Sequence, residues 1–162
     1  MSWNDFGERL QRALREVTDR SVLIVAAAAE LGAGYVQFIG VDDLLVAEAS
    51  GPEFVTGVAT HTAEQPIMLA AGWVAPTRPQ PNWSFELALP ALTSEYAELA
   101  GRCVTALRDV FGIAEPEVLT YRAWREPEQQ PPGVTWPPER FDQLDPGENP
   151  LILPSLGLRQ VV

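Results

Sequence analysis

The sequence predicts an α+β fold in which an antiparallel sheet packs against about three helices. Apolar residues recur at three- and four-residue steps in residues 2–18 and again in residues 94–111, which is the spacing of amphipathic helices. Between them lie short runs that are rich in β-branched and aromatic residues. The connections between the first three runs are too short for a parallel crossover, so these three strands should form an antiparallel meander.

The predicted elements follow in the order α-β-β-β-α-β-α-β. Ser2 is a suitable N-cap for the first helix, and Gly112 is a suitable end for the long third one. A short second helix should begin near Thr62 and end at Gly72. The strands are expected at residues 21–28, 35–39, 44–49, 83–89 and 117–124.

Composition divides the chain near residue 125. Residues 1–125 are predicted to form one domain, which can bury a sizeable core without disulfides. Eight of the 15 prolines lie in residues 127–162. Residues 126–162 are therefore predicted to be a proline-rich C-terminal tail, extended or weakly ordered, rather than a second domain.

The first hairpin, GYVQFIGVDDLLVAEA at residues 34–49, hardly alternates between apolar and polar residues, and only Gln37 and Glu48 interrupt its apolar runs outside the turn. We expect its turn at residues 40–43. The residues opposite one another, which share a face, would then be Ile39 and Leu44, Gln37 and Val46, and Tyr35 and Glu48. The other face would be purely apolar and should meet the helices; its residues are Val36, Phe38, Leu45, Ala47 and Ala49.

The second face of this hairpin is half apolar with two polar residues, a composition typical of protein contact surfaces. A patch of that kind is seldom left open on a monomer. It could be covered by a second copy of the chain, a client segment, the chain's own tail or a helix. We expect a partner to contact this face and two tryptophans in proline-rich surroundings. The predicted partner-binding residues are Tyr35, Gln37, Ile39, Leu44, Val46, Glu48, Trp83 and Trp136.

The charge of the chain argues against one class of partner. The formal net charge is −11, from 22 acidic and 11 basic residues. An acidic protein repels phosphate backbones, so nucleic acid is not expected as a partner. Between residues 30 and 100 the chain has one basic residue, Arg78, against nine acidic ones. This central segment should carry a negative field that favours encounter with a basic partner.

Cysteine use and hydropathy bear on the compartment. The single cysteine, Cys103, excludes an intrachain disulfide and is typical of a reducing compartment. The opening residues lack a signal-peptide pattern, and the longest apolar run, residues 22–29, is too short to span a bilayer. We therefore expect a cytoplasmic protein without a membrane partner.

The sequence offers no recognisable catalytic, metal or cofactor site. His61 is the one histidine, and one histidine alone makes neither a triad nor a metal centre. Cys103 lies in the apolar stripe of the long helix, where a core role is expected. Asp42 and Asp43 are typical turn residues. We expect no cofactor and no enzymatic activity; a cryptic pair of carboxyl groups is the lowest-ranked alternative.

A set of short motifs occurs in a recognisable order. They are Trp3 and Phe6 on the opening helix, GYVQF at 34–38, Glu48 in the third strand, GW at 72–73, PNW at 81–83, TALRDVFGIAEP at 105–116 and LTY at 119–121. Together they resemble the YbjN-like and type III secretion chaperone-like domain group, called TY-Chap, over roughly residues 1–125. The resemblance implies an actinobacterial α+β domain that binds peptides or partner proteins, often dimerises and has no catalytic residues. The proline-rich tail departs from this pattern.

These observations lead to one main hypothesis for function. The protein should be a non-enzymatic peptide- or protein-binding module of the chaperone or adaptor type, expected as a homodimer, that uses the half-apolar sheet face. The alternative is a structural subunit of a larger assembly, or an acidic neutralising partner of a basic protein.

Overall fold

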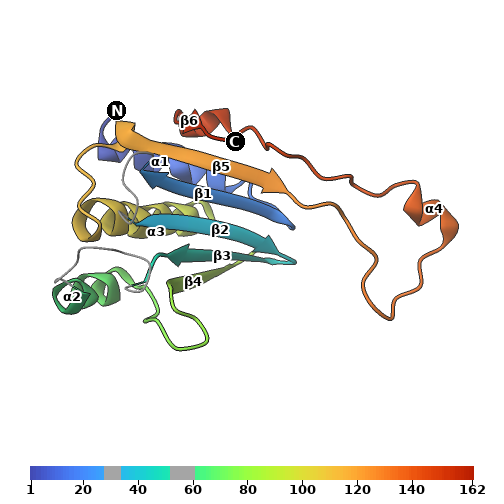
Figure 1. The fold of residues 1–162 in the computed structure, drawn as a ribbon, viewed down its shortest axis with the longest axis horizontal. Helices are drawn as coiled ribbons and strands as arrows, with labels where there is room; N and C mark the ends of the chain where they lie inside the picture. The colour runs from blue at the N-terminus through green and yellow to red at the C-terminus, as the bar shows by residue number, and fades with distance from the viewer. Residues whose placement is uncertain (28–33, 52–60) are drawn as a thin grey trace.

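The computed structural model describes residues 1–27, 34–51 and 61–162, with the backbone alone for residues 61–64. The predicted α+β class is confirmed, and the order of helices and strands agrees with the prediction up to residue 125 (Figure 1). The helices are α1 (Trp3–Leu14), α2 (His61–Ala71), α3 (Thr93–Val104, continued by the π-helix Thr105–Val110) and α4 (Pro138–Phe141). The strands are β1 (Ser21–Ala27), β2 (Tyr35–Val41), β3 (Leu44–Ala49), β4 (Trp83–Ala88), β5 (Leu119–Arg125) and β6 (Arg159–Gln160).

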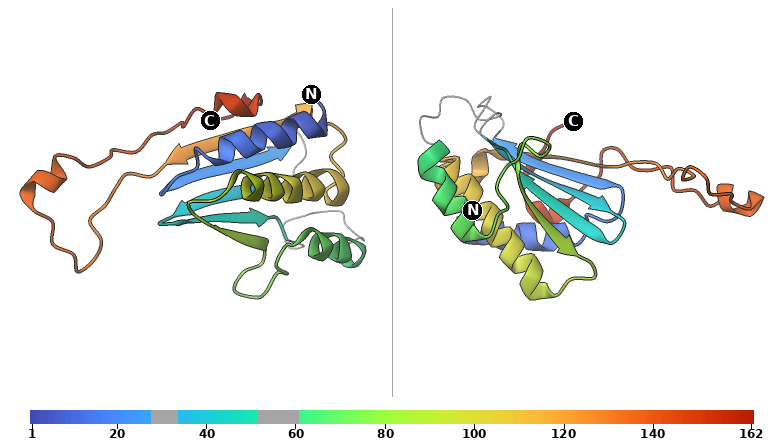
Figure 2. Two further views of the ribbon diagram at one scale, coloured as in Figure 1. Left: turned by 180° about the vertical axis from the view of Figure 1, so that it is seen from behind. Right: turned by 90° about the horizontal axis from the view of Figure 1, so that it is seen from below.

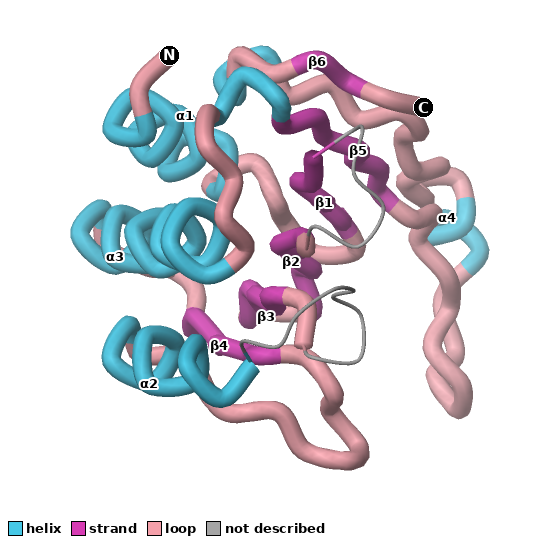
Figure 3. Tube along the Cα trace, turned by 60° about the vertical axis from the view of Figure 1, so that its left-hand side comes forward, coloured by secondary structure: helices cyan, strands magenta, loops and turns pink. Residues whose placement is uncertain are grey.

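The described strands form one sheet in the order β4-β3-β2-β1-β5-β6. All neighbours are antiparallel except β5 and β6, which are parallel. The predicted meander of the first three strands is therefore confirmed, whereas the sixth strand was not predicted. Helices α1, α2 and α3 lie side by side on one face of the sheet (Figures 2 and 3). We call that face the inner face and the opposite one the outer face.

The hairpin of β2 and β3 has a different register from the one predicted. Its turn is only Asp42-Asp43, so that Val41 pairs with Leu44, and the other pairs shift with it. The pairs are Ile39 with Val46, and Gln37 with Glu48. The register prediction is wrong by two residues. Because side chains alternate with a period of two, a shift of two leaves every residue on its predicted face.

Two local features explain the shorter turn. Asp42 adopts a φ of 55°, a left-handed conformation that aspartate tolerates, and its N–H donates to Asp19 Oδ1 at 2.8 Å. Gly40 lies inside β2 because of a close backbone approach. A Cβ at this position would lie 1.8 Å from the carbonyl oxygen of Thr18. Glycine at this position therefore permits the close approach of Thr18 within β2, which leaves Gly40 in the strand and only Asp42 and Asp43 in the turn.

The inner face and the helices enclose the core. The five residues predicted for the inner face of the hairpin are all fully buried, which confirms that prediction. They face buried residues of α1 such as Phe6 and Leu10, and of α3 such as Leu99. Cys103 is fully buried as predicted, and this burial raises the pKa of its thiol. Within the described residues, no helix has both the length and the apolar character needed to cross a bilayer.

The segment after Arg125 is more ordered than its composition predicts. It leaves the end of β5 as an arm, residues 127–147, which projects past the end of the sheet and carries α4 (Figure 1). It then returns as a strap, residues 148–161, beside β5. Leu153 and Leu156 of the strap are fully buried in the same core as residues 1–125. The two leucines, three positions apart, bury apolar surface that holds the strap in place.

Candidate functional site

The outer face has none of the helices α1, α2 and α3 upon it (Figure 3). Two rows of side chains cross this face from β5 to β3. The first row is apolar and consists of Trp124, Val22, Ile39 and Val46, each the Cα partner of the next. All four side chains are partly exposed. Three steps between neighbouring strands of about 4.8 Å make this row about 14 Å wide.

The second row is mostly polar. It consists of Arg122, Ile24, Gln37, Glu48 and Ser84, from β5 to β4. The side-chain amide of Gln37 donates a hydrogen bond to Glu48, and so does the amide of Gln80 from the loop before β4, residues 74–82. Each amide donates to a different oxygen of the carboxylate. Glu48 is thereby held in a single orientation on the sheet surface.

A further polar group anchors the end of this face. Tyr35 lies on the outer face, and its hydroxyl accepts a hydrogen bond from Asn82 Nδ2 at 3.3 Å. Its backbone N–H donates to Ser50 Oγ at 2.9 Å. The outer face is therefore asymmetric, with apolar residues near the β2–β3 turn and an ordered group of polar residues at the other end. An apolar surface with a few hydrogen-bonding groups is typical of protein contact surfaces.

The charges on the outer face also differ from one side to the other. Glu48 and the exposed Glu86 are close to the β3–β4 side, where the exposed Asp43 also lies in the hairpin turn. On the β5 side, the guanidinium carbon of Arg122 lies 5.8 Å from the centre of the Trp124 ring. A cation beside an aromatic face is attracted to it. The outer face therefore has an acidic edge at one side and a cationic, aromatic edge at the other.

The structure brings together six of the eight residues predicted to bind a partner. Those six, all partly exposed on the outer face, are Tyr35, Gln37, Ile39, Leu44, Val46 and Glu48. Trp83 lies on the inner face opposite Ala49 and is 6% exposed. This corrects its assignment, because a side chain buried in the core has almost no surface to offer. Trp136 lies on the arm against Phe141, with ring centres 5.7 Å apart.

Sequence reasoning missed four residues of this surface. They are Val22, Ile24, Arg122 and Trp124. From Tyr121 to Trp124 in β5, buried residues alternate with exposed or partly exposed ones, and this alternation was visible in the sequence LTYRAWR. It would have placed Arg122 and Trp124 on one face. The run VLIV in β1 gave no such signal, because every residue in it is apolar.

The chain matches the model of one protein family over residues 1–125. That family, TY-Chap3, is described as T3SS (YopN, CesT) and YbjN peptide-binding chaperone 3. The chain belongs to the TY-Chap3 family. The resemblance inferred from the sequence motifs is thus confirmed, whereas no curated protein and no solved structure matches the chain. The match ends at Arg125, the last residue of β5, so the arm and the strap lie beyond it.

The carboxyl groups with shifted pKa values in this TY-Chap3 chain share one direction of shift. Four carboxyl groups among the described residues have shifted pKa values, and all four are lowered. The main partners are Ser2 for Asp5, Arg108 for Asp109, the N-terminal ammonium for Glu117, and Arg125 for Asp145. A carboxyl group that acts as a proton donor near neutral pH needs a raised pKa. The side chain of His61 lies outside the described residues.

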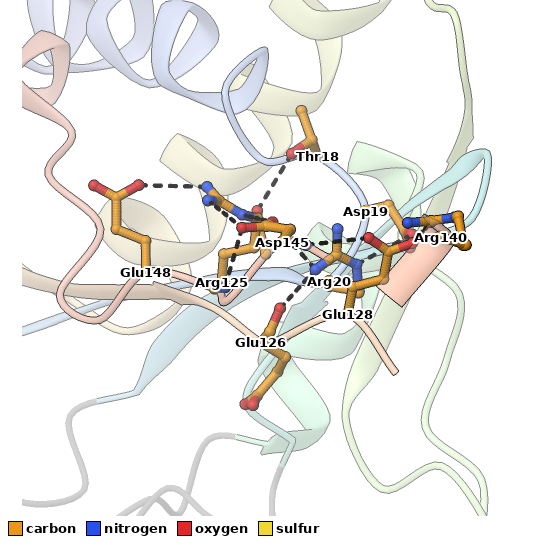
Figure 4. A network of polar contacts seen from close by, with 11 residues as sticks. Thr18, Asp19, Arg20, Arg125, Glu126, Glu128, Arg140, Asp145 and Glu148 are labelled. Atoms are coloured by element: carbon orange, nitrogen blue, oxygen red, sulfur yellow. Dashed lines mark hydrogen bonds and ion pairs between the residues drawn. The ribbon is translucent and has the colours of Figure 1, made fainter. Parts of the chain in front are cut away.

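A network of charges joins the two ends of the arm to the TY-Chap3 domain (Figure 4). Arg125 donates two hydrogen bonds to Asp145, at 2.6 and 3.1 Å, and Arg20 donates a third at 3.3 Å. Backbone pairing continues the contact, because Glu128 N–H donates to the carbonyl of Asp145 at 2.9 Å. Arg140 and Glu128 form a further ion pair within the arm. We call this network the arm clamp.

The arm clamp has a predictable response to pH. The hydrogen bonds from Arg125 hold the pKa of Asp145 well below its ordinary value. A lowered pKa stabilises the folded state fully above the ordinary value near 4, and this stabilisation is lost as the pH falls further. Asp145→Asn should therefore melt at a lower temperature than the wild type at pH 7 and at pH 5. The difference should shrink progressively below about pH 4.

Thermal melts followed by circular dichroism at several pH values measure this difference. Asp142→Asn changes an exposed carboxyl group on the same arm and is the matched control. Equal melting temperatures for Asp145→Asn and wild type at pH 7 would show that the clamp does not stabilise the fold.

Proposed function

We propose that this TY-Chap3 protein is a non-enzymatic chaperone or adaptor that binds a peptide, or an unfolded segment of a protein, on the outer face of its sheet. The observation that carries the proposal is the apolar row of four strands, Trp124 to Val46, on a face that α1, α2 and α3 leave uncovered. The family's description as a peptide-binding chaperone supports the same class of ligand.

The chemistry of the outer face suggests the kind of segment it accepts. Apolar side chains of the client would cover Ile39 and Val46, since burying apolar area provides most of the binding free energy. A basic residue of the client would lie towards Glu48 and Glu86, on the acidic side. The formal net charge of −11 would speed encounter with a basic client, and it would make that encounter sensitive to salt.

Oligomeric state and compartment belong to the same proposal. A second copy of the chain could cover the outer face in a homodimer until a client displaces it, and a cytoplasmic location would suit this role. Trp136 on the arm could add to a partner contact, because its ring lies only partly buried against Phe141 and Arg140.

Val46→Arg should weaken client binding at least tenfold and leave the fold intact. The long charged side chain would interrupt the apolar row, and Val46 is partly exposed, so that the charge can reach water. The client is first identified by capture from the native cell extract and mass spectrometry, and its affinity is then measured by calorimetry. Each tenfold loss corresponds to about 1.4 kcal/mol.

Val118→Arg is the matched control for this variant. Val118 is 51% exposed and lies before β5, away from the two rows, so the same substitution should leave binding unchanged. Client binding that is equal in Val46→Arg and wild type would refute the outer face as the site. If the protein instead has a structural or neutralising role, added salt should weaken partner binding, and it should do so equally in Val46→Arg, Val118→Arg and the wild type.

A further inference from the structure

The strap lies on the TY-Chap3 domain in the manner of a bound peptide. It follows the edge of β5 through backbone hydrogen bonds. Arg125 and Glu148 exchange two of them, at 2.7 and 2.9 Å. Leu151 N–H donates to Ala123 at 2.8 Å, and Val161 N–H donates to the carbonyl of Tyr121 at 2.8 Å. Addition of a segment to a sheet edge is a common way for proteins to bind extended peptides.

Two side chains anchor the strap in the core. Leu153 and Leu156 are fully buried, whereas Ile152 and Pro154, on either side of Leu153, are exposed. The turn that carries both leucines packs against α1. The N–H of Leu153 also donates to the hydroxyl of Tyr121 at 3.0 Å. Two buried anchor residues, with the exposed Pro154 and the partly exposed Ser155 between them, are the pattern of a short linear peptide in its site.

The strap contacts named above are all with residues of the family domain, in β5 and α1. The family match ends at Arg125, so β5 is an edge strand of the matched domain, and the strap is an addition to that edge. The arm of 21 residues between them, 127–147, projects away from the sheet in Figure 1, and the arm clamp in Figure 4 holds its two ends on the domain. A tether of this kind gives the strap a high effective concentration near its site without making it part of the domain.

We propose that the edge of β5 and the adjoining pocket beside α1 form a second peptide-binding site, which the strap occupies as a displaceable resident peptide. The ligand class is an extended segment with two leucines three positions apart, as in the strap's own LPSLG at residues 153–157. This site goes beyond the outer face in the proposed function, since it lies at the sheet edge and on the side of α1. Release of the strap opens it, and the arm clamp opposes that release.

The test uses the full chain with a protease site placed at the exposed tip of the arm, near Gly133, and cut after folding. A fluorescent peptide of residues 148–162 is then added, and its binding is followed by anisotropy. The cut protein should take up the peptide at least tenfold more tightly than the uncut protein, in which the tethered strap competes. A peptide with both Leu153→Ser and Leu156→Ser should bind at least tenfold more weakly than the wild-type peptide.

Two results would overturn the proposal. One is a cut protein that neither releases its strap nor takes up the peptide, which would show that the strap is a permanent part of the core. The other is uptake that is equal for the two peptides. Val46→Arg distinguishes the two sites, because it alters the outer face and not the edge of β5. Uptake of the peptide should therefore be unchanged in this variant, whether or not the outer face binds a client. If Val46→Arg abolishes uptake, the peptide binds the outer face and the second site is refuted.

Hydrogen exchange on the uncut chain covers the case in which the cut protein unfolds. The strap amides of Leu151, Leu153 and Val161 should exchange through local opening, at least tenfold faster than the amide of Leu23 in β1. Asp145→Asn should accelerate the strap amides further and leave Leu23 unchanged. Exchange of all four amides at one common rate, limited by global unfolding, would refute a displaceable strap.

Discussion

Phe38→Asp should abolish folding, whereas Ile39→Asp should give a folded protein. Phe38 is fully buried on the inner face, and Ile39, the next residue, is partly exposed on the outer face. Loss of the ring costs about 3–5 kcal/mol, and an unpaired buried carboxylate adds several kcal/mol more. The sum is comparable to the total stability of a folded domain, about 5–15 kcal/mol, so little or none of that stability would remain. At Ile39 the carboxylate can remain hydrated, so the cost is much smaller.

Circular dichroism and amide NMR spectra of the two variants measure this contrast. The pair is well matched, because the same residue is introduced at adjacent positions of one strand. Unfolding of both variants would mean that the outer face is as inaccessible to water as the core. The outer face could then not be a binding site. Ile39→Asp should also weaken the client identified with the wild-type protein, because it places a charge in the centre of the apolar row.

Leu153→Ala and Leu156→Ala should each lower the free energy of unfolding by about 2–5 kcal/mol. Both side chains are fully buried, and alanine would leave a cavity beside α1. Urea unfolding followed by tryptophan fluorescence measures the loss. Ile152→Ala is the control, since Ile152 is 54% exposed and its change should stay within about 0.5 kcal/mol.

The double variant distinguishes a permanent strap from a displaceable one. If the strap is a permanent part of the core, the two losses should nearly add. If the strap detaches as a unit, the total loss cannot exceed the free energy that attaches it, so the double variant should lose less than the sum. Losses below about 0.5 kcal/mol for both single variants would contradict the burial of the strap in the core.

The outer face was partly predictable from the sequence because face assignment needs only local alternation. When the pairing of strands 35–39 and 44–49 shifts by an even number of residues, each side chain stays on the same face of the sheet. Six site residues were therefore placed on one face despite an error of two residues in the register. Register itself depends on the conformation of Asp42 and on the approach of Thr18 to Gly40. Neither is visible in a hydrophobic pattern.

Other parts of the site depend on which strands become neighbours. Trp124 and Val22 share the outer face because β5 pairs with β1, although they are about a hundred residues apart in the sequence. Trp83 shows the reverse case. Its proline-rich surroundings suggested an exposed position, but its pairing with Ala49 turns it towards the core. Local composition could not decide either position.

The sequence alone determined the fold class, the amphipathic faces of α1 and α3, the apolar inner face of the hairpin and the acidic charge of the protein. These are properties of spacing and composition along short segments. Only the tertiary structure decided that the outer face stays free of α1, α2 and α3, and that Leu153 and Leu156 return to the core beside β5. The physical reason is that burial depends on which surfaces meet in the folded chain. A proline-rich segment of 37 residues after Arg125 is long enough to reach many surfaces of the domain, and only the burial of Leu153 and Leu156 decides which of these surfaces it covers.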